Sequence, residues 1–299
     1  MKLSRGYLYV AITWILSWFI IFSWQLFSNL WLSILEISIL PFLPVIFILL
    51  PVILRRKQWF TRENIWPLLI FWLVEVFSVL TQFGGIFFKV PVAVIILLLY
   101  TQPLWTILLS WVFLKEKFKR FHIVSCIFVL WWVFFLAFPF STWVAINPIG
   151  LIMGLLWGIF LSFWIMTGAW VSRKNIDPYF IKFSGNLFMI IFLFLLAPLF
   201  VLLIPNPHLT GFHFNHSWII WIGCIIYAIF VNIVPHIAYF TWIKKVPAMS
   251  AGIIMLFDPV VGTILAMTFF HQSPTIFILI WWVLILLGNI LVMIYGQKE

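Results

Sequence analysis

Apolar stretches of about 20 residues, separated by short polar ones, follow each other along the whole chain. A helix that crosses a bilayer needs about 20 consecutive apolar residues. These runs are too long and continuous for barrel strands, and an open sheet leaves its backbone unsatisfied in lipid. The pattern therefore predicts an all-α integral membrane protein with ten transmembrane helices. They are expected at 6–26, 31–54, 66–86, 91–114, 121–139, 148–170, 179–203, 217–242, 247–270 and 275–296.

Composition agrees with this pattern, because 66% of the 299 residues are apolar and only 8% are charged. A soluble domain carries about 25% charged residues, so lipid must cover most of this surface. The formal net charge of +10 does not indicate nucleic acid, since the basic residues sit at predicted helix ends and form no patch. Cys126 and Cys224 fall inside predicted spans as apolar fillers, so no disulfide, metal or cofactor is expected.

The distribution of lysines and arginines predicts the orientation of the chain. With the N-terminus inside, sixteen basic residues are cytoplasmic and Lys89 alone lies outside. The cytoplasmic set is Lys2, Arg5, Arg55, Arg56, Lys57, Arg62, Lys115, Lys117, Lys119, Arg120, Arg173, Lys174, Lys182, Lys244, Lys245 and Lys298. Both termini are thus expected inside. Met1–Arg5 is basic, but no small-residue cleavage site follows, so a plasma (inner) membrane protein without a removed signal peptide is expected.

Two segments of the chain share an uncommon pattern. Each begins with Lys-Val-Pro, at Lys89 and at Lys245, and each reaches a second proline fourteen residues after the lysine, at Pro103 and at Pro259. These segments form the fourth and the ninth predicted spans. Agreement in spacing, proline position and helix rank indicates an internal duplication.

A duplication after five helices places the second copy upside down in the membrane. Lys89 and Lys245 are accordingly predicted on opposite sides. The two repeats are expected at 1–140 and 147–299. Inverted repeats of this kind are typical of secondary transporters, whose binding site lies at the midplane between the two halves.

The residues around the first of these prolines resemble a known family. The run Tyr100-Thr101-Gln102-Pro103-Leu104-Trp105, followed by Leu114-Lys115-Glu116-Lys117, is similar to the fourth-helix signature of the EamA-like family of the drug/metabolite transporter (DMT) superfamily. That signature is a proline in the helix, an apolar stretch and an acidic residue at the cytoplasmic end. The second copy has Phe257-Asp258-Pro259 and Phe269-Phe270-His271-Gln272, with Gln272 in place of Glu116.

The resemblance implies an architecture and an activity. In the family, helices three, four, eight and nine, with one and six, surround a central cavity, and helices five and ten pack away from it. Members move amino acids, nucleotide sugars, phosphorylated sugars, choline and other metabolites or drugs by secondary transport. The sequence contains no G-x-x-x-x-G-K-[ST] phosphate-binding loop for ATP.

Placing an ionisable group at the centre of a helix in the hydrocarbon costs about 2.5–3.5 kcal/mol of insertion free energy. Each such residue is therefore expected to have a structural or functional role. Glu75, Ser78 and Gln82 recur at i, i+3 and i+7 along one face of the third span. Such a face lines a solute cavity or contacts another helix, where a hydrogen bond contributes about 0.6 kcal/mol. In a cavity, Glu75 would bind an ammonium group of the solute or load and release a coupling proton.

A comparable polar face is predicted on the eighth span, the symmetry partner of the third. His236 has Asn232 at i−4 and Tyr239 at i+3. Pro235 interrupts the backbone ladder and frees carbonyl groups. The face either lines the site or meets a neighbouring helix. Zinc is not expected, because no second His or Cys lies at ligand spacing from His236.

The two duplicated spans differ in one polar position. Asp258 precedes Pro259 near the middle of the ninth span, and its counterpart in the fourth span is the neutral Gln102. The pair is expected to form one charged and one neutral wall of the site. In the alternative, Asp258 pairs with a helix end or a histidine.

The remaining ionisable residues are expected nearer to the membrane surfaces. Glu36, early in the second span, is expected to reach water at the outer headgroups. Glu116 is expected to balance its lysine neighbours, and His122 belongs to the same cytoplasmic rim. Glycines and prolines expected to act as flex points, with tight packing as the alternative, are Gly84, Gly85, Pro103, Gly252, Pro259 and Gly262.

The aromatic residues, 20 Trp and 35 Phe among them, are too numerous to serve one site. Most are expected in contact with lipid or at the interfaces. Trp14, Trp18, Tyr100 and Trp157 are better placed, and an aromatic lining beside a carboxylate favours a cation or an aromatic solute.

Together these features predict a secondary transporter, an exporter or exchanger, that moves a small amphiphilic metabolite such as an amino acid or an amine by alternating access. Alternatives are efflux of multiple drugs or cationic compounds, transport of another DMT solute such as a nucleotide sugar, lipid flipping, and a noncatalytic membrane scaffold. The expected partners are the bilayer and a small solute, with a coupling proton or other ion left open. No nucleophile with a base, paired carboxylates or H-E-x-x-H pattern is recognisable, so an enzyme is not expected.

Overall fold

The structure of the protein is a computed structural model. It describes residues 5–17, 27, 32–87, 98–99, 101–117, 123–124, 127, 148–203, 210–255, 268, 283 and 287. All regular structure within these residues is helical, which confirms the predicted all-α class for this part of the chain.

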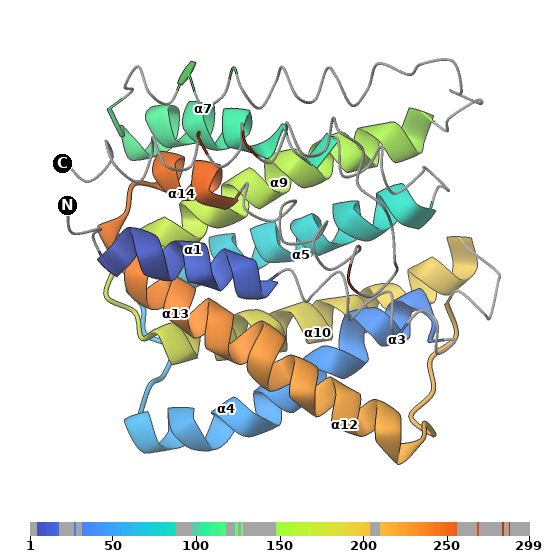
Figure 1. The fold of residues 1–299 in the computed structure, drawn as a ribbon. Helices are drawn as coiled ribbons and strands as arrows, with labels where there is room; N and C mark the ends of the chain where they lie inside the picture. The colour runs from blue at the N-terminus through green and yellow to red at the C-terminus, as the bar shows by residue number, and fades with distance from the viewer. Residues whose placement is uncertain are drawn as a thin grey trace.

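The helices run roughly side by side along the long direction of the molecule (Figure 1). Those of the first half are α1 (Arg5–Ser17), α3 (Ile34–Ile39), η1 (Leu40–Phe42), α4 (Leu43–Arg56), α5 (Ile65–Phe87) and α7 (Gln102–Leu114). Those of the second half are α9 (Pro148–Arg173), α10 (Pro178–Leu203), α12 (Trp218–Ile226), η3 (Tyr227–Ile233), α13 (Val234–Trp242), η4 (Ile243–Lys245) and α14 (Ala248–Ile254).

Five helical stretches of the described chain are long and apolar enough to cross a membrane. They are Leu35–Arg56, Ile65–Gln82, Pro148–Arg173, Pro178–Leu199 and Trp218–Lys245, and the apolar helix Gln102–Leu114 is shorter. Each coincides with an expected span. Large apolar side chains such as Phe47, Leu195 and Leu202 are more than 70% exposed, as expected for surfaces that face lipid. The structure is therefore that of a multi-span helical membrane protein, while the full count of ten and the inverted repeat stay predictions.

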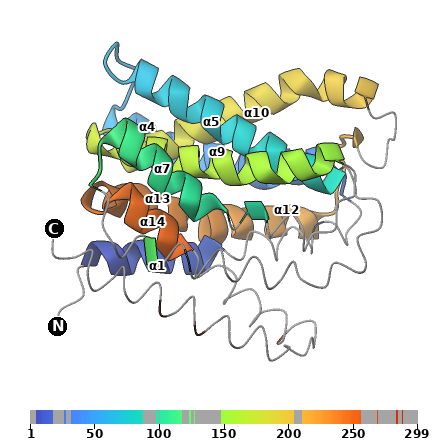
Figure 2. The ribbon, with the colours of Figure 1, turned by 90° about the horizontal axis from the view of Figure 1, so that it is seen from above.

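The packing of the bundle brings the two halves of the chain together. α5 lies along α9, α7 packs against α9 and α14, and α1 crosses α13. α10 packs against α4, α5 and α13. Figure 2 shows the same bundle from above, with α5 beside α9 and beside α10. The faces of α5 and α13 that meet α10 are thus the interior surface on which the polar residues have to be placed.

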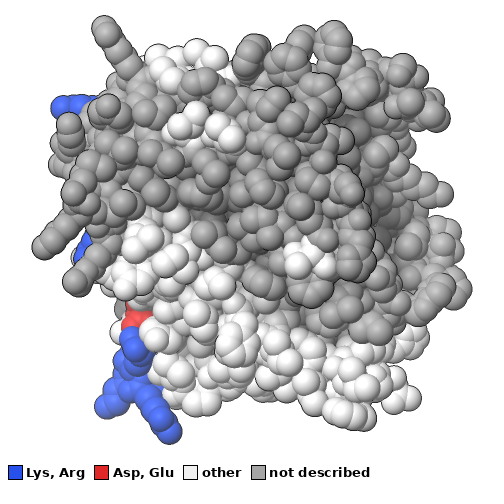
Figure 3. Space-filling view, viewed as in Figure 1, with Lys and Arg blue, Asp and Glu red and all other residues white. Residues whose placement is uncertain are grey.

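Exposed basic side chains gather at the end of the bundle where α4, α7, α9 and η4 finish, which we call the basic end. They are Arg55, Arg56, Lys57, Lys115, Lys117, Arg173, Lys174, Lys244 and Lys245. In Figure 3 the blue groups stand at this end of the visible face. Cations at helix C-termini are favoured by the helix dipole. Lys57 and Lys115 end their helices in the left-handed conformation, with φ of 52° and 55°.

The helix that carries Asn232 and His236 widens just before Pro235. Residues Tyr227–Ile233 form a π-helical segment between α12 and α13. Proline removes one backbone donor and its ring crowds the carbonyl one turn earlier, so the ladder has to adjust there. Widened turns of this kind are frequent at functional sites. Here the segment sets where Asn232 lies relative to His236.

Candidate functional site

The polar face predicted on the third span is buried inside the bundle. Glu75 and Ser78 on α5 are 8% and 7% exposed, and Gln82 is partly exposed. Glu75 lies ten residues after the start of α5 at Ile65, which is about 15 Å along the helix. Its carboxylate is therefore well inside a membrane-spanning helix.

The Glu75 carboxylate lies against α10, where the chain has a glycine. A Cβ atom added at Gly185 would lie 2.5 Å from Glu75 Oε2, so a larger side chain there collides with the carboxylate. Lys182, one turn earlier on the same face of α10, is 3% exposed and interacts electrostatically with Glu75. The two groups are not joined by a hydrogen bond. A carboxylate and an ammonium group thus share the interior of the bundle without touching.

Two asparagines and a histidine extend this polar region towards η3 and α13. Asn186 donates from Nδ2 to Asn232 Oδ1 at 3.4 Å, and both residues are buried. His236 Nδ1 lies 2.7 Å from the backbone oxygen of Asn232. A carbonyl oxygen only accepts, so Nδ1 carries the proton and Nε2 of the neutral ring remains an acceptor. Lys182 also interacts electrostatically with His236. The set Glu75, Lys182, Asn186, Asn232 and His236 is the polar cluster.

Aromatic rings border the polar cluster. Trp164 of α9 meets His236 edge-on, with ring centroids 5.8 Å apart, and stacks on Tyr239 at 5.1 Å. Phe240 lies 6.5 Å from the His236 ring. Phe71 lies beside the same carboxylate contact, since its ring is 3.6 Å from the Cβ position of Gly185. The electron-rich faces of such rings attract cations, and so does the negative charge of Glu75. Both features therefore favour a positively charged group at this place.

Two buried oxygens of the cluster have no hydrogen-bond partner among the described residues. They are Glu75 Oε2 and Asn186 Oδ1. Buried polar atoms in native proteins almost always have a partner, and exceptions mark a bound water, an ion or a functional site. The cluster therefore has acceptors left for the donor groups of a bound molecule.

Other residues predicted for the site pack between α7 and α9. Gln102 is buried at the start of α7, and its backbone oxygen accepts a hydrogen bond of 2.8 Å from Ser162 Oγ on α9. Its side-chain amide contacts Thr106 Oγ1. Trp157 is buried on α9 beside Leu99, Leu151 and Leu161. No contact given by the structure joins these residues to the polar cluster.

Of the positions expected to flex, four lie in helices that the structure describes: Gly84, Gly85, Pro103 and Gly252. Gly84 and Gly85 lie within the continuous helix α5, and Pro103 stands in the first turn of α7, where its missing N–H is not needed. A Cβ at Gly252 would lie 2.8 Å from Thr106 Cγ2, so this glycine permits close contact between α14 and α7. Tyr100, Asp258, Pro259, His122, Trp18, Gly262 and Gln272 lie outside the described residues.

Glu116 joins three helices at the basic end. Its Oε1 accepts from Arg173 Nη2 at 2.8 Å and from the backbone N–H of Ala248 at 2.9 Å, and its Oε2 accepts from the N–H of Met249 at 3.1 Å. The first N–H groups of a helix lack partners within it, so the carboxylate caps α14. This set of contacts is the Glu116 clamp.

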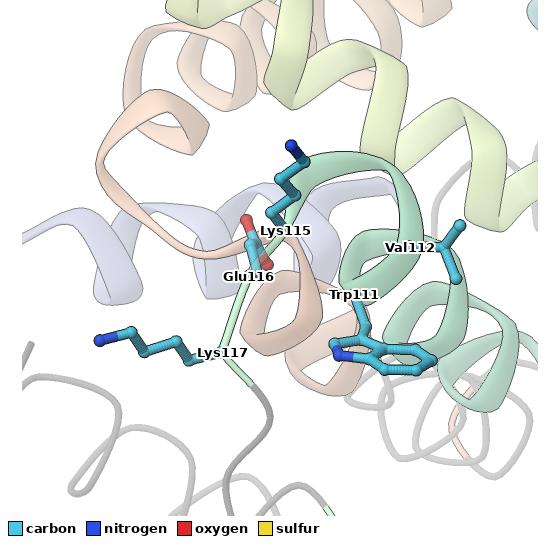
Figure 4. A pocket seen from close by; sticks show the side chains of 5 residues that line it. All are labelled: Trp111, Val112, Lys115, Glu116 and Lys117. Atoms are coloured by element: carbon cyan, nitrogen blue, oxygen red, sulfur yellow. The ribbon is translucent and has the colours of Figure 1, made fainter.

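The surroundings of Glu116 differ from those expected for a residue that balances neighbouring lysines. Figure 4 shows its carboxylate beside the ribbon of α14, while Lys115 and Lys117 extend in other directions. Trp111, Val112 and these three residues line a shallow hollow of about 750 Å³. The acidic residue of the sequence signature therefore ties α7 to α9 and α14.

Glu116→Gln should lower the thermal stability of the protein. The amide keeps one acceptor but presents an NH₂ group to a backbone donor, and the charge opposite Arg173 is lost. An unmet buried hydrogen bond costs about 1–3 kcal/mol. Thermal unfolding of the purified protein measures the change, with Glu63→Gln in an exposed turn as the matched control. Equal midpoints for Glu116→Gln and wild type would show that the clamp contributes nothing.

Glu36 forms a second set of contacts at the opposite end of the bundle. Its carboxylate accepts from the N–H groups of Ser33 and His213, both at 2.8 Å, and lies 3.0 Å from His216 Nε2. The first contact belongs to a capping box at the start of α3. Glu36 is 3% exposed, so the expectation that it reaches headgroup water is wrong. Protein groups from the segment before α12 take the place of water.

The residue that sequence reasoning missed is Lys182. It was assigned to the cytoplasmic basic set, yet the structure buries it in the polar cluster. A signal was present in the sequence, because Lys182 falls inside the span expected at 179–203, with Gly185 and Asn186 at i+3 and i+4. Counting charges along the chain does not reveal which way a side chain faces.

The fold and the apolar spans define a class, the multi-span α-helical membrane proteins. Residues 148–294 match the model of the EamA-like transporter family. An uncharacterized transporter from Clostridium kluyveri is 27% identical over 225 residues, which cover 73% of this chain and 68% of that protein. The second half of the chain is thus similar to the EamA-like transporter family, in agreement with the predicted resemblance to the DMT superfamily.

A solved crystal structure of another protein has the same fold. It superposes with a TM-score of 0.75 over 99% of this chain and 100% of its own, at 16% sequence identity. Agreement over the whole length at so low an identity is a likeness of fold alone. Function has to be argued from the residues of this chain.

Proposed function

We propose that this protein is a secondary transporter that moves a small amphiphilic cation, an amine or an amino acid, with the polar cluster as its binding site. The observation that carries the proposal is the Glu75 carboxylate, buried inside a membrane-spanning helix with Oε2 unpaired. A buried carboxylate with an oxygen left unpaired is unfavourable for folding, so a functional reason is expected. Binding an ammonium group supplies both the charge and the donors that this carboxylate lacks.

The surroundings of Glu75 support a solute with an apolar part. Trp164, Tyr239 and Phe240 offer ring faces beside the cluster, and His236 Nε2 and Asn186 Oδ1 offer further acceptors. An ammonium group over such rings gains about 0.5–2 kcal/mol. The donors of the solute would meet Glu75, and its apolar part would lie against the aromatic residues.

For the transport cycle we propose the arrangement predicted from the sequence: ten spans in two inverted repeats, 1–140 and 147–299, with both termini in the cytoplasm. The family match at 148–294 supports the second repeat. Alternating access would then open one end of the bundle at a time. The Glu116 clamp lies at the basic end, where one of these openings would occur.

Exchange of labelled solutes in proteoliposomes tests this proposal. The probes are tyramine, an aromatic amine that is protonated at neutral pH, phenylalanine as a zwitterion and benzoate as an anion. We expect protein-dependent exchange of tyramine, of phenylalanine or of both, compared with liposomes without protein. Exchange of benzoate alone would contradict the proposal, and movement of no probe would favour a membrane scaffold.

A further inference from the structure

Lys182 is the one buried basic residue among the described lysines and arginines whose exposure is known. Every other such residue is exposed and lies at a helix end or in a connecting segment. Lys182 lies four residues after the start of α10 at Pro178, about 6 Å along the helix. An ammonium group held inside a membrane protein is as unfavourable as a carboxylate, so it also needs a reason.

Lys182 lies within the polar cluster, near acceptors that have no partner among the described residues. Glu75 and His236 lie on α5 and α13, two of the helices that pack against α10, and both are close enough to Lys182 for an electrostatic interaction. Glu75 can lie against α10 because Gly185, on the same face as Lys182, has no side chain. Glu75 Oε2 and Asn186 Oδ1 have no partner among the described residues.

The ammonium group of Lys182 and that of a cationic solute would both bind the same group, the Glu75 carboxylate. Both are hydrogen-bond donors with one positive charge, and a single carboxylate lies within the cluster. The Lys side chain is a flexible stem of four carbons. Its ammonium group can therefore approach or leave Glu75 while the backbone of α10 stays in place.

We propose that Lys182 is a tethered counter-cation: its ammonium group balances the charge of Glu75 when no solute is bound and moves away when a cationic solute binds. The inference rests on the proposed function and adds a specificity-determining residue to it. Lys182 supplies the positive charge beside Glu75 in the protein without solute, and the solute supplies it in the loaded protein. The negative charge of Glu75 is therefore balanced in both states.

The two forms of transport make different demands on this pair. Net flux requires the empty protein to return from one side to the other, and the empty site then needs Lys182 beside Glu75. During exchange the site is loaded when the protein changes conformation in either direction, so the solute itself supplies the positive charge. Loss of Lys182 should therefore block net flux and spare exchange.

The experiment compares wild type, Lys182→Met and Lys182→Arg in proteoliposomes loaded with labelled tyramine. Net efflux is measured into solute-free buffer, and exchange into buffer with excess unlabelled tyramine. We expect Lys182→Met to lose net efflux by at least about tenfold, because an unpaired carboxylate has to reorient in the membrane, and to keep most of its exchange. Lys182→Arg should keep both. Equal losses of net efflux and exchange, or no loss, would overturn the inference.

A second measurement examines the pair without any solute. In protein labelled with ¹⁵N-lysine, the Nζ signal that disappears in Lys182→Met belongs to Lys182. That signal should shift in Glu75→Gln and stay unchanged in Glu36→Gln, the same substitution at the far end of the bundle. An unshifted signal in Glu75→Gln would overturn the pairing. Failure of wild type to move any probe would overturn the proposed function, and the Nζ signal would still decide the pairing.

Discussion

Glu75→Gln should abolish both net flux and exchange of tyramine in proteoliposomes. The substitution keeps the size of the side chain and removes its charge, so the ammonium group of the solute loses its counter-ion in a buried site. A hydrogen bond to a charged partner contributes about 1.5–3 kcal/mol, which corresponds to roughly a tenfold to hundredfold loss of affinity. Flux per folded protein is the measurement. Flux at the wild-type rate would remove Glu75 from the mechanism.

Stability measurements separate this effect from misfolding. Glu75→Gln leaves Lys182 without an opposite charge, and removing one partner of a buried pair costs up to about 3–5 kcal/mol. The double variant Glu75→Gln with Lys182→Met removes both charges. It should regain most of the lost stability and none of the flux. Recovery of flux in the double variant would show that the single variant failed through folding alone.

Glu36→Gln is the matched control for Glu75→Gln, because both glutamates are buried in helices. The Glu36 carboxylate accepts from two backbone N–H groups and contacts His216, so the amide should lower the unfolding midpoint. Glu36 has no part in the proposed binding site. Flux per folded protein should therefore remain close to that of wild type.

Gly185→Ala should cause the second largest loss of transport. The added methyl group would lie 2.5 Å from Glu75 Oε2, far closer than a van der Waals contact, so the carboxylate has to leave its place against α10. Glycine to alanine within a helix otherwise stabilises it by up to about 1 kcal/mol. We therefore expect a stable helix with at least about tenfold weaker tyramine binding, because the ion pair is misplaced. Thermal-shift titration and exchange measure the effect.

Gly223→Ala is the same change at a site with room for it. A Cβ atom at Gly223 would lie 3.4 Å from Phe27 Cε1, an ordinary contact. Stability and exchange should both stay near those of wild type. A parallel loss in Gly223→Ala would mean that any added methyl group in these helices impairs transport, and the contact of Gly185 with Glu75 would then carry no special weight.

Several elements of the molecule were predictable because they depend on local properties of the chain. The spans at 66–86, 148–170 and 179–203 follow from apolar runs whose length matches the bilayer, and the structure has helices there. The polar face with Glu75 and Ser78 followed from helical periodicity, and both side chains are buried. The proline and acidic residue around Gln102 and Glu116 indicated a resemblance to the EamA-like family, and the model of that family matches residues 148–294.

Other features depended on contacts between residues far apart in the chain. Glu36 was expected in water and is held by His213 and His216, which are more than 170 residues away. Glu116 was expected beside its lysine neighbours and instead binds Arg173 and the start of α14. No local pattern reports such partners, because the geometry that joins them arises only when the helices pack.

The sequence by itself determined that this protein is a multi-span helical membrane protein similar to the EamA-like family, with a carboxylate, Glu75, inside one of its spans. These properties follow from hydrophobicity, helical periodicity and a short motif, all of which act within a few turns of one helix. Only the tertiary structure decided what faces that carboxylate. Lys182, Gly185 and Asn186 on α10 meet α5 and α13 through side-chain packing, and this packing brings the second charge into the same interior.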